Sequence, residues 1–498
     1  MKKIILYIFN IIFFLSFILV IFINFMYKYK YQYNISIIIA VLFFLLISLL
    51  IMHILKKEKK SININRFFVL NLILIIILQC ISAIAFANYP KSDLGIVYNI
   101  ANSNKDISNN GYLNIHPNNI AITVLLRLII KSTSSILKNG YIASMAFNII
   151  MIDIAIIFTF LIAKEILGKK QTIMLMLFLT ITNPIYMYVT YFYTDTLSML
   201  FPVAILYMYI LFNKNREKKS KYIYLIIIAL LSTIGMYIKM TVLIMTIAII
   251  IYELLLRDKG KLKYACIIPI FILIFHTIFY NTVAYMNIIN KEKIEQKALP
   301  FQYYLLLGLE YPGSLNSLED YIISTGTDGR ENKVKVINNV IEKKINLKKE
   351  KNWKSLINKK LTYTWADGTY FIMEKLTTKM YNKHPLQVIL KYGKYHKQFL
   401  YITDIIHFSM IILICISGLL FRKNKKDGIE IMKISIFGLF LYLLISETRS
   451  RYLVNYIPIM VLLESYSIYH IYFIIRKGYR KISKSISNII NKLYKKEV

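Results

Sequence analysis

Long apolar runs recur along the whole chain, separated by short basic clusters and by two longer polar segments. The runs are continuous rather than alternating, and about twenty apolar residues are enough for a helix to cross a membrane. Since only helices and closed barrels satisfy their backbone polar groups in lipid, the pattern predicts an all-α polytopic membrane protein. We predict about twelve spans, at residues 4–26, 35–55, 66–87, 141–164, 172–190, 196–212, 222–238, 240–256, 264–283, 399–421, 430–446 and 452–475.

The basic clusters between closely spaced spans all agree with one orientation. An excess of Lys and Arg marks cytoplasmic loops, and an even number of crossings returns both termini to the same side. The sequence therefore predicts a multi-pass plasma-membrane protein with both termini in the cytoplasm. The division of one long run at Lys239 is inferred from this parity. The clusters lie at residues 56–60, 168–170, 214–221, 257–263 and 421–427 and in the tail from Arg476.

Five regions follow from this map. Two N-terminal spans (1–60) precede a transmembrane core (61–283), which carries an outer loop at 88–140. A polar, α-rich extracytoplasmic region (284–398), further spans (399–476) and a basic cytoplasmic tail (477–498) complete the chain. In the outer loop, Pro117 to Asn119 make a good helix start, and apolar residues with interspersed cations predict an interfacial helix from Ile120 to Ser132.

Composition narrows the class further. Of 498 residues, 57% are hydrophobic, and the formal net charge is +36. The basic clusters lie between spans, so topology and anionic headgroups explain the charge better than nucleic acid does. The three cysteines, Cys80, Cys266 and Cys415, fall in apolar runs without metal-ligand spacing, and we expect small buried residues. Neither a cofactor nor a metal is predicted, because the sequence has no glycine-rich phosphate loop and no HExxH helix.

Several ionisable residues lie at the outer ends of predicted spans. Asp93 follows the span that ends near Ala87, and Asp195 lies in the motif TYFYTDTLSML. A carboxylate at such a position suits catalysis at the membrane face, but a helix cap or a surface charge fits either acid equally well. Lys239 interrupts a long apolar run, which suits either anion binding or a lysine that reaches the headgroups.

The motif SETRSRYLVNYIP adds three charged residues at the outer end of a late span. Arg449 and Arg451 carry guanidinium groups, which bind phosphate with two parallel hydrogen bonds, although headgroup anchoring is the alternative. Without an ATP-binding signature, chemistry here would depend on an activated substrate supplied in the membrane. Candidate substrate-binding residues are Glu447 in this motif, His116 and Asn118 in the first outer loop, and Asp367 in the motif TYTWADGTYF.

An ordered set of short motifs from residue 88 to 458 resembles a known class. The motifs are SDLGIVYNIA with GYLNIHPNN, YFYTDTLSMLFP, IGMYIKMT, YYLLLGLEYPG, TWADGTYF and ETRSRYLVNYIP. Together they resemble the GT-C class of polyprenyl-phosphate-sugar-dependent membrane glycosyltransferases, which includes protein O-mannosyltransferases and aminoarabinose transferases, and more closely a Gram-positive branch of it.

The resemblance implies a catalytic cavity at the outer leaflet, closed by the first loop. It makes Asp93 the catalytic base or the acid that binds the acceptor, and Asp195 a second catalytic-site acid that helps to position the acceptor or the site. Lys239, Arg449 and Arg451 would be the donor phosphate-binding residues. The implied partners are a polyprenyl-phosphate-sugar donor, membrane lipids and an envelope glycopolymer, glycolipid or protein as acceptor. The chain departs from the class in two respects. Two extra spans precede the matching ones, and Leu94 follows Asp93 where the class often has a paired acid, which argues against a divalent cation.

Two other functions stay open at this stage. A flippase or polymerase of lipid-linked glycans would also need cations, but it would distribute them along a central passage. A secondary transporter would show an internal repeat with broken helices near the midplane, and the sequence has no convincing self-similarity. Convergence of Asp93, Asp195, Lys239 and Arg449 on one outer cavity would favour the transferase.

Overall fold

The computed structural model describes residues 2–26, 35–58, 62–103, 105–215, 217–256, 262–310, 317–324, 326–327, 329–351, 353–420 and 427–494. Parts of the predicted basic clusters at 56–60, 214–221, 257–263 and 421–427, and the end of the motif YYLLLGLEYPG, lie outside these ranges.

The described chain is helical almost throughout and contains no β-strand. The only strand-like pairing in these ranges is an isolated antiparallel bridge between Asn88 and Met380. The helices are α1 (Lys2–Met26), α2 (Ile35–Lys57), α3 (Ile64–Phe86), α4 (Ser92–Asn102), α5 (Gly111–Ile115), η1 (Pro117–Asn119), α6 (Ile120–Thr133), α7 (Gly140–Ile166), α8 (Lys169–Ile181), α9 (Pro184–Met187), α10 (Thr194–Leu197), α11 (Leu200–Lys214), α12 (Lys218–Ile238), η2 (Met240–Val242), α13 (Leu243–Leu256), α14 (Leu262–Tyr285), α15 (Lys291–Lys297), α16 (Phe301–Gly308), α17 (Ser317–Ser324), α18 (Arg330–Lys351), α19 (Trp353–Trp365), α20 (Ile372–Lys375), η4 (Pro385–Ile389), α21 (His396–Ser417), α22 (Asp427–Ile445), η5 (Ser450–Tyr456) and α23 (Ile457–Tyr494).

The predicted fold class is confirmed: the chain is an all-α polytopic membrane protein. Within the described ranges, ten helical segments are long and apolar enough to cross a membrane, and the helix over Met240–Leu255 is shorter. The predicted helix of the first polar loop is also present, as α6. The count of about twelve spans is not confirmed.

The predicted span 172–190 is not one continuous helix. α8 ends at Ile181, and the short α9 begins at Pro184. Thr182 is extended, with φ −78° and ψ 113°. Pro184 has no backbone N–H to donate, and in a continuous helix its ring would clash with the carbonyl four residues earlier, which disfavours continuation of α8 through this position. The polar backbone freed by the break is bound by neighbours, since Asn148 Nδ2 donates to the carbonyl oxygens of Tyr188 at 2.9 Å and Val189 at 3.1 Å.

A second break occurs at Lys239, where the sequence predicted one. α12 ends at Ile238, Lys239 is extended with φ −157° and ψ 118°, and η2 follows. Unpaired backbone groups are costly in lipid, so a break needs partners from neighbouring segments. Tyr456 Oη supplies one by donating to the Thr241 carbonyl at 3.1 Å.

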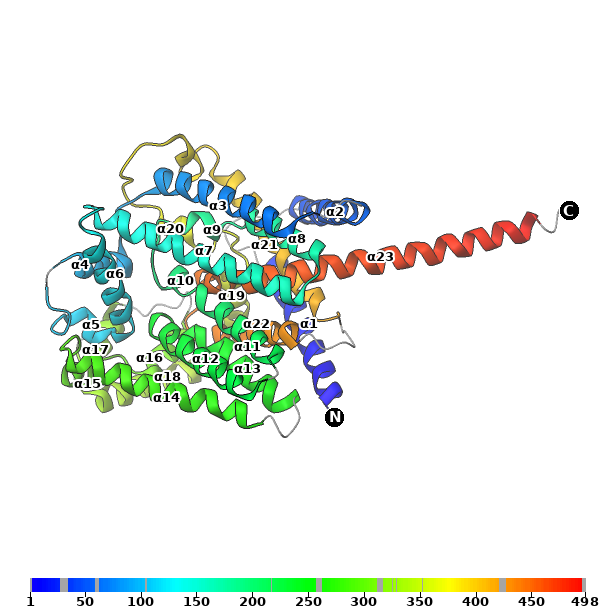
Figure 1. Ribbon diagram of the computed structural model, residues 1–498. Coiled ribbons are helices and arrows are strands. Elements are labelled where there is room, and N and C mark those ends of the chain that lie inside the picture. Colours follow the sequence, from blue (N-terminus) through cyan, green and yellow to red (C-terminus); the bar gives the residue numbers. More distant parts are fainter. Residues whose placement is uncertain are drawn as a thin grey trace.

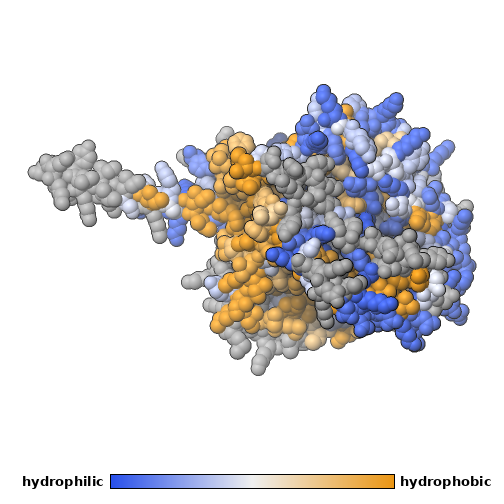
Figure 2. All heavy atoms as spheres, turned by 180° about the vertical axis from the view of Figure 1, so that it is seen from behind, coloured by the Kyte–Doolittle hydropathy of each residue, from blue (hydrophilic) through white to orange (hydrophobic). Residues whose placement is uncertain are grey.

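The polar segments gather at one end of the helical bundle. Figure 1 shows α4, α5, α6 and α15 to α18 at the end opposite to that from which α23 projects. The two polar segments contact each other there, because the backbone N–H of Leu299 donates to the Ile115 carbonyl at 3.1 Å. Figure 2 shows a band of hydrophobic surface toward the α23 end and mainly hydrophilic surface at the other. This arrangement fits a bundle in lipid that carries an elaboration on one membrane face.

The cysteines follow the prediction only in part. Cys415 is buried, whereas Cys80 and Cys266 are exposed on the bundle surface. Both lie in long apolar helices, α3 and α14, whose outer faces are apolar. The prediction was wrong for these two residues because a lipid-facing helix is apolar on its outside as well.

Candidate functional site

A buried ion pair joins two of the predicted site residues. Asp195 lies in the first turn of α10, and Lys239 lies at the break after α12. The Lys239 ammonium donates to Asp195 Oδ1, and the two side chains are only 9% and 1% exposed. Asp195 Oδ2 has no hydrogen-bond partner in the described chain. Burial lowers the pKa of Lys239, while the Asp195 charge opposes that shift. Lys239 is therefore a paired interior cation rather than a lysine extended to the headgroups.

Arg451 lies beside this pair in η5, within a group of tyrosines. Its Nη1 donates to Tyr191 Oη at 3.1 Å and its Nη2 to Tyr452 Oη at 3.5 Å, while Nε has no partner among the described residues. The guanidinium also lies 5.2 Å from the centre of the Tyr452 ring and 6.0 Å from that of Tyr193. The Lys239 ammonium also lies over the Tyr452 ring, 5.0 Å from its centre. The side chain of Arg451 is buried, yet no described carboxylate pairs with it.

Arg449 and Glu447 form a neighbouring, more exposed pair. Arg449 Nε lies 2.9 Å from Glu447 Oε1, with side chains 23% and 20% exposed, although the N–H is not directed at the carboxylate. Tyr452 Oη donates to the other Glu447 oxygen. The Arg449 guanidinium lies 5.4 Å from the centre of the Phe371 ring. Tyr452 thus connects Glu447 to Arg451.

Asp93 reaches the same cluster through a chain of hydrogen bonds. Tyr112 Oη donates to Asp93 Oδ1 at 3.2 Å, and Asn119 Nδ2 donates to Tyr112 Oη at 2.9 Å. Tyr193 Oη then donates to Asn119 Oδ1 at 2.7 Å, and the Tyr193 ring faces Arg451. Asp93 is half-buried in the first turn of α4. The polar segment between α3 and α7 therefore brings this carboxylate to the edge of the cationic cluster.

His116 and Asn118 lie on the same loop at different distances from Asp93. The His116 ring is 4.9 Å from that of Tyr112, and burial lowers the pKa of His116 while the Asp93 charge acts in the opposite direction. Asn118 is exposed and accepts a hydrogen bond from Tyr304 Oη at 3.5 Å. His116 thus contacts Tyr112, the residue that binds Asp93, whereas Asn118 lies on the surface.

Asp367 is bound to the backbone of its own turn. Its carboxylate accepts from the backbone N–H groups of Thr369 at 3.0 Å and Phe371 at 2.8 Å, and from Ser450 Oγ at 3.0 Å. These bonds hold a turn in which Tyr370 and Phe371 have φ of 54° and 68°, a costly conformation for residues with side chains. Asp367 therefore fixes the turn that brings Phe371 and the following α20 to the site.

Lys375, which sequence reasoning missed, also lies in the cluster. It ends α20, and its ammonium lies 5.5 Å from the centre of the Tyr191 ring and 5.8 Å from that of Phe371. No described carboxylate pairs with it. Burial, and then the charges of Arg451 and Arg449, lower its pKa to about 8. One signal was available, since Lys375 lies four residues after the end of the motif TWADGTYF, but it is one of many lysines in that region.

The helix α16 covers this cluster from the polar side. Burial and then the charge of Glu447 raise the pKa of Tyr304 on α16 to about 12. The Lys360 ammonium donates both to the Gly308 carbonyl at 2.7 Å and to the Ser446 carbonyl at 2.8 Å. A Cβ on Gly308 would lie 2.0 Å from the Ile445 carbonyl oxygen, so the end of α16 packs directly on the backbone of α22.

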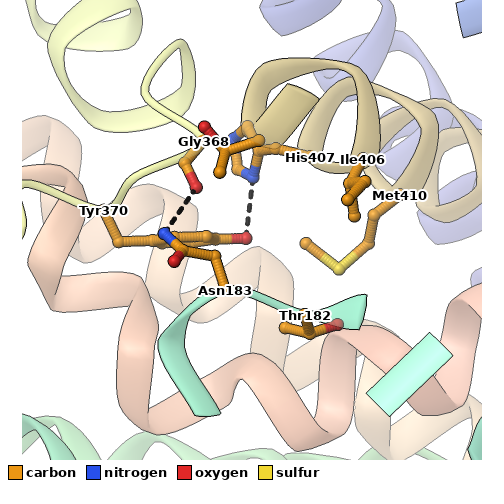
Figure 3. A pocket seen from close by; sticks show the side chains of 8 residues that line it. Thr182, Asn183, Gly368, Tyr370, Ile406, His407 and Met410 are labelled. Carbon is orange, nitrogen blue, oxygen red and sulfur yellow. Dashed lines mark hydrogen bonds between the residues drawn. The ribbon is translucent and has the colours of Figure 1, made fainter. Parts of the chain in front are cut away.

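A small pocket lies apart from the charged cluster, at the break after α8. Figure 3 shows Asn183 Nδ2 donating to the Gly368 carbonyl at 3.4 Å, and Tyr370 Oη at 2.7 Å from His407 Nδ1. His407 Nε2 lies 2.9 Å from the Trp365 carbonyl oxygen. The polar groups that line the pocket bind one another. These hydrogen bonds hold the turn that leads to Phe371 and Lys375.

The described residues include no group of three His, Cys, Asp or Glu side chains close enough to hold a metal ion. What the structure does bring together is four cations, Lys239, Lys375, Arg449 and Arg451. Asp195 and Glu447 balance two of them, and the hydrogen-bonded chain from Asp93 reaches the edge of the group. Two neighbouring cations thus have no carboxylate partner in the described chain, which makes the cluster suited to binding an anion.

Comparison with known proteins gives a family but no activity. A search of proteins with curated descriptions found no match to this chain. One family model, described as "conserved hypothetical integral membrane protein", matches residues 1–471. Because the match covers nearly the whole chain, this protein belongs to that family of conserved integral membrane proteins.

Proposed function

We propose that this chain is a membrane glycosyltransferase that moves a sugar from a polyprenyl-phosphate-linked donor to a cell-envelope acceptor on the extracytoplasmic face, with inversion. The observation that carries the proposal is a chain of hydrogen bonds that links Asp93 to the edge of a cluster with two uncompensated cations. Arg451 and Lys375 have no carboxylate partner in the described chain, and Tyr193 connects Arg451 to the hydrogen-bonded chain from Asp93. Cations in a buried site attract a phosphate, and a nearby carboxylate accepts a proton from a hydroxyl.

The two predicted catalytic acids have different surroundings, which suggests different roles. Asp195 is bound to Lys239 in the interior, so in this proposal it orients and balances the lysine. Asp93 is half-buried, and among the described residues its carboxylate accepts a hydrogen bond only from the Tyr112 hydroxyl, so it is the better base. Arg449 lies nearer the surface and would contact the donor phosphate from the rim.

The proposed reaction is a single displacement. The acceptor hydroxyl oxygen attacks the anomeric carbon and its proton passes to Asp93. The bond between that carbon and the phosphate oxygen breaks, and polyprenyl phosphate leaves with one more negative charge than the donor phosphodiester carried. Arg451 and Lys375 stabilise the charge that develops on the leaving phosphate. Attack opposite the leaving group inverts the anomeric carbon.

Two helices on the polar side would limit hydrolysis of the donor. α6 follows the segment that begins with α4 and Asp93, and α16 packs on the end of α22, two residues before Glu447. A covered site excludes water and strengthens the interaction between cations and phosphate. Cations gathered in one cluster also suit a transferase better than a flippase, which would distribute them along its passage.

The first test is transfer of labelled sugar from polyprenyl-phosphate-sugar donors to envelope acceptors in membranes that contain wild-type protein or Asp93→Asn at equal abundance. Loss of a general base lowers the rate by about 10²- to 10⁴-fold. Asp106→Asn is the matched control, because Asp106 is an exposed acid of the same loop that binds only Ser108 and Asn109.

We expect transfer by wild type and by Asp106→Asn and loss of transfer by Asp93→Asn. Equal rates for all three proteins would remove Asp93 as the base. If none of the proteins transfers any donor but each moves lipid-linked glycans between leaflets, the flippase replaces the transferase.

A further inference from the structure

The helix α23 is much longer than a single membrane crossing requires. Its 38 residues extend about 57 Å at 1.5 Å per residue, whereas the hydrocarbon core is about 30 Å thick. The nineteen residues from Ile457 to Ile475 are enough to cross the core. Arg476 and Lys477 follow as the first basic residues, where a membrane surface is expected. Residues 477–494 therefore lie beyond the bilayer core, and Figure 1 shows this part of α23 projecting away from the bundle.

The sequence of this projecting part separates apolar and basic positions around the helix. With 100° between successive residues, the positions of Tyr479, Ile482, Ile486, Ile489, Ile490 and Leu493 fall within an arc of about 100°. The positions of Lys477, Arg480, Lys481, Lys484 and Lys492 fall on the opposite side. Nothing in the structure covers the apolar side at its start, because Tyr479 is 72% exposed and Ile482 is 61% exposed.

We propose that residues 477–494 lie along the membrane surface, with the apolar side in the acyl boundary and the basic residues bound to anionic lipid headgroups. A helix with one narrow apolar side and a Lys- and Arg-rich remainder has the composition of an interfacial helix. From Arg476 to Lys496 the sequence contains eight basic residues and no acid, which matches a negative surface. The preceding membrane span holds the helix at that surface.

Gly478 provides the place where the chain can turn from the span direction to the surface. A Cβ at this position would meet no atom within 4 Å, so neighbours do not hold the local geometry. Glycine weakens a helix relative to alanine, and kinks in helices occur at glycine. The bend falls at the junction between the span and the amphipathic part.

A second copy of the chain fits this surface less well. Two such helices paired along their apolar sides would bring together basic residues without any acid to balance them. Like charges on neighbouring helices are destabilising, and coiled coils use opposite charges beside the apolar seam. The charge pattern therefore selects an anionic lipid surface over self-association.

The test uses the full chain in vesicles of phosphatidylcholine alone or with 30 mol% phosphatidylglycerol. The three native cysteines are first replaced by alanine, and an environment-sensitive fluorophore is attached to Ile482→Cys or Lys484→Cys. Quenchers on the lipid acyl chains report contact with the membrane, and iodide reports contact with water. We expect the acyl-chain quencher to reach position 482 in anionic vesicles, while iodide reaches position 484. In neutral vesicles iodide should reach both positions.

A charge variant and its matched control separate lipid binding from other causes. With position 482 labelled, the double variant Lys477→Gln, Arg480→Gln should have a ratio of docked to free helix about 30-fold lower than that of the unsubstituted helix. Each basic residue near an anionic surface raises this ratio about 5-fold. Lys477→Arg with Arg480→Lys keeps both charges and should keep the ratio. Equal exposure of positions 482 and 484 to iodide in anionic vesicles would overturn the proposal. The proposal would also be overturned if position 482 were shielded from iodide in both kinds of vesicle and energy transfer occurred between chains. That result would indicate that a second copy covers the apolar side.

Discussion

Replacing Lys239 by methionine removes one half of the buried ion pair and leaves the Asp195 carboxylate without compensation. That carboxylate is 1% exposed, and its second oxygen already lacks a partner in the described chain. Breaking a buried pair by removing one partner costs about 3–5 kcal/mol. The expected result is a large fall in the free energy of unfolding, measured as a lower thermal midpoint of the detergent-solubilised protein.

The double variant Lys239→Met with Asp195→Asn separates stability from function. It removes both charges together, so most of the lost stability should return, apart from about 1–3 kcal/mol for an amide without full hydrogen bonding. If Lys239 binds the donor phosphate, the double variant is stable but does not transfer sugar. If the pair only joins α10 to α12, transfer returns with stability.

An exposed pair in the same protein gives the control. Lys214 and Glu165 form an ion pair with side chains 55% and 26% exposed, and such pairs contribute about 0–1 kcal/mol. Lys214→Met should therefore leave the midpoint nearly unchanged. Equal and small effects of Lys239→Met and Lys214→Met would refute the argument that the Asp195 pair is buried and costly to break.

Two further predictions concern the turn beside the pocket and the lysine that follows it. Lys375 has a pKa of about 8, so its cation is lost as the pH rises through 8, and transfer should fall on that limb of the pH–rate profile. Lys375→Arg keeps its charge, so the fall in transfer rate should move to higher pH. If the pH–rate profile of Lys375→Arg equals that of wild type, Lys375 does not contact the phosphate. Gly368→Ala should lower the free energy of unfolding by about 1–3 kcal/mol, because its Cβ would lie 2.3 Å from the Thr403 carbonyl oxygen. The loss is measured as a lower thermal midpoint. Gly111→Ala, whose Cβ meets no atom within 4 Å, should leave the midpoint unchanged, and equal midpoints for the two variants would contradict the close packing at Gly368.

The same lysine also has an effect on folding in the absence of ligand. Its folded-state pKa lies below the ordinary value of 10.5, so the unfolded chain binds more protons between these two values. The free energy of unfolding contributed by this group therefore rises as the pH increases from about 8 to 10.5. Ligand-free stability and transfer should thus change in opposite directions over this range.

The sequence predicted the helical membrane fold well, because apolar runs of about twenty residues have one main structural solution. It also located the break at Lys239, where a charge interrupts an apolar run. It failed at 172–190, because hydropathy does not register that a proline, Pro184, disfavours a continuous helix.

The candidate site was less accessible to sequence reasoning. Asp195 and Lys239 were identified separately as charges at span ends, but their pairing depends on how α10 packs against the break after α12. Asp367 was read as a substrate-binding candidate, whereas its carboxylate holds the backbone of its own turn. Lys375 escaped notice because only three-dimensional packing distinguishes it from the other lysines of its region.

The hydrogen bonds of Lys360 connect α16 to the segment that carries Arg449. A single ammonium holds the last carbonyl of α16 and the first carbonyl after α22, three residues before Arg449. If α16 moves away from α22, this ammonium loses one of its two carbonyl acceptors, which costs a buried hydrogen bond. In the proposed transferase, substrate entry past α16 and the placement of Arg449 would then be coupled. A change that loosens the helix should alter affinity and access together.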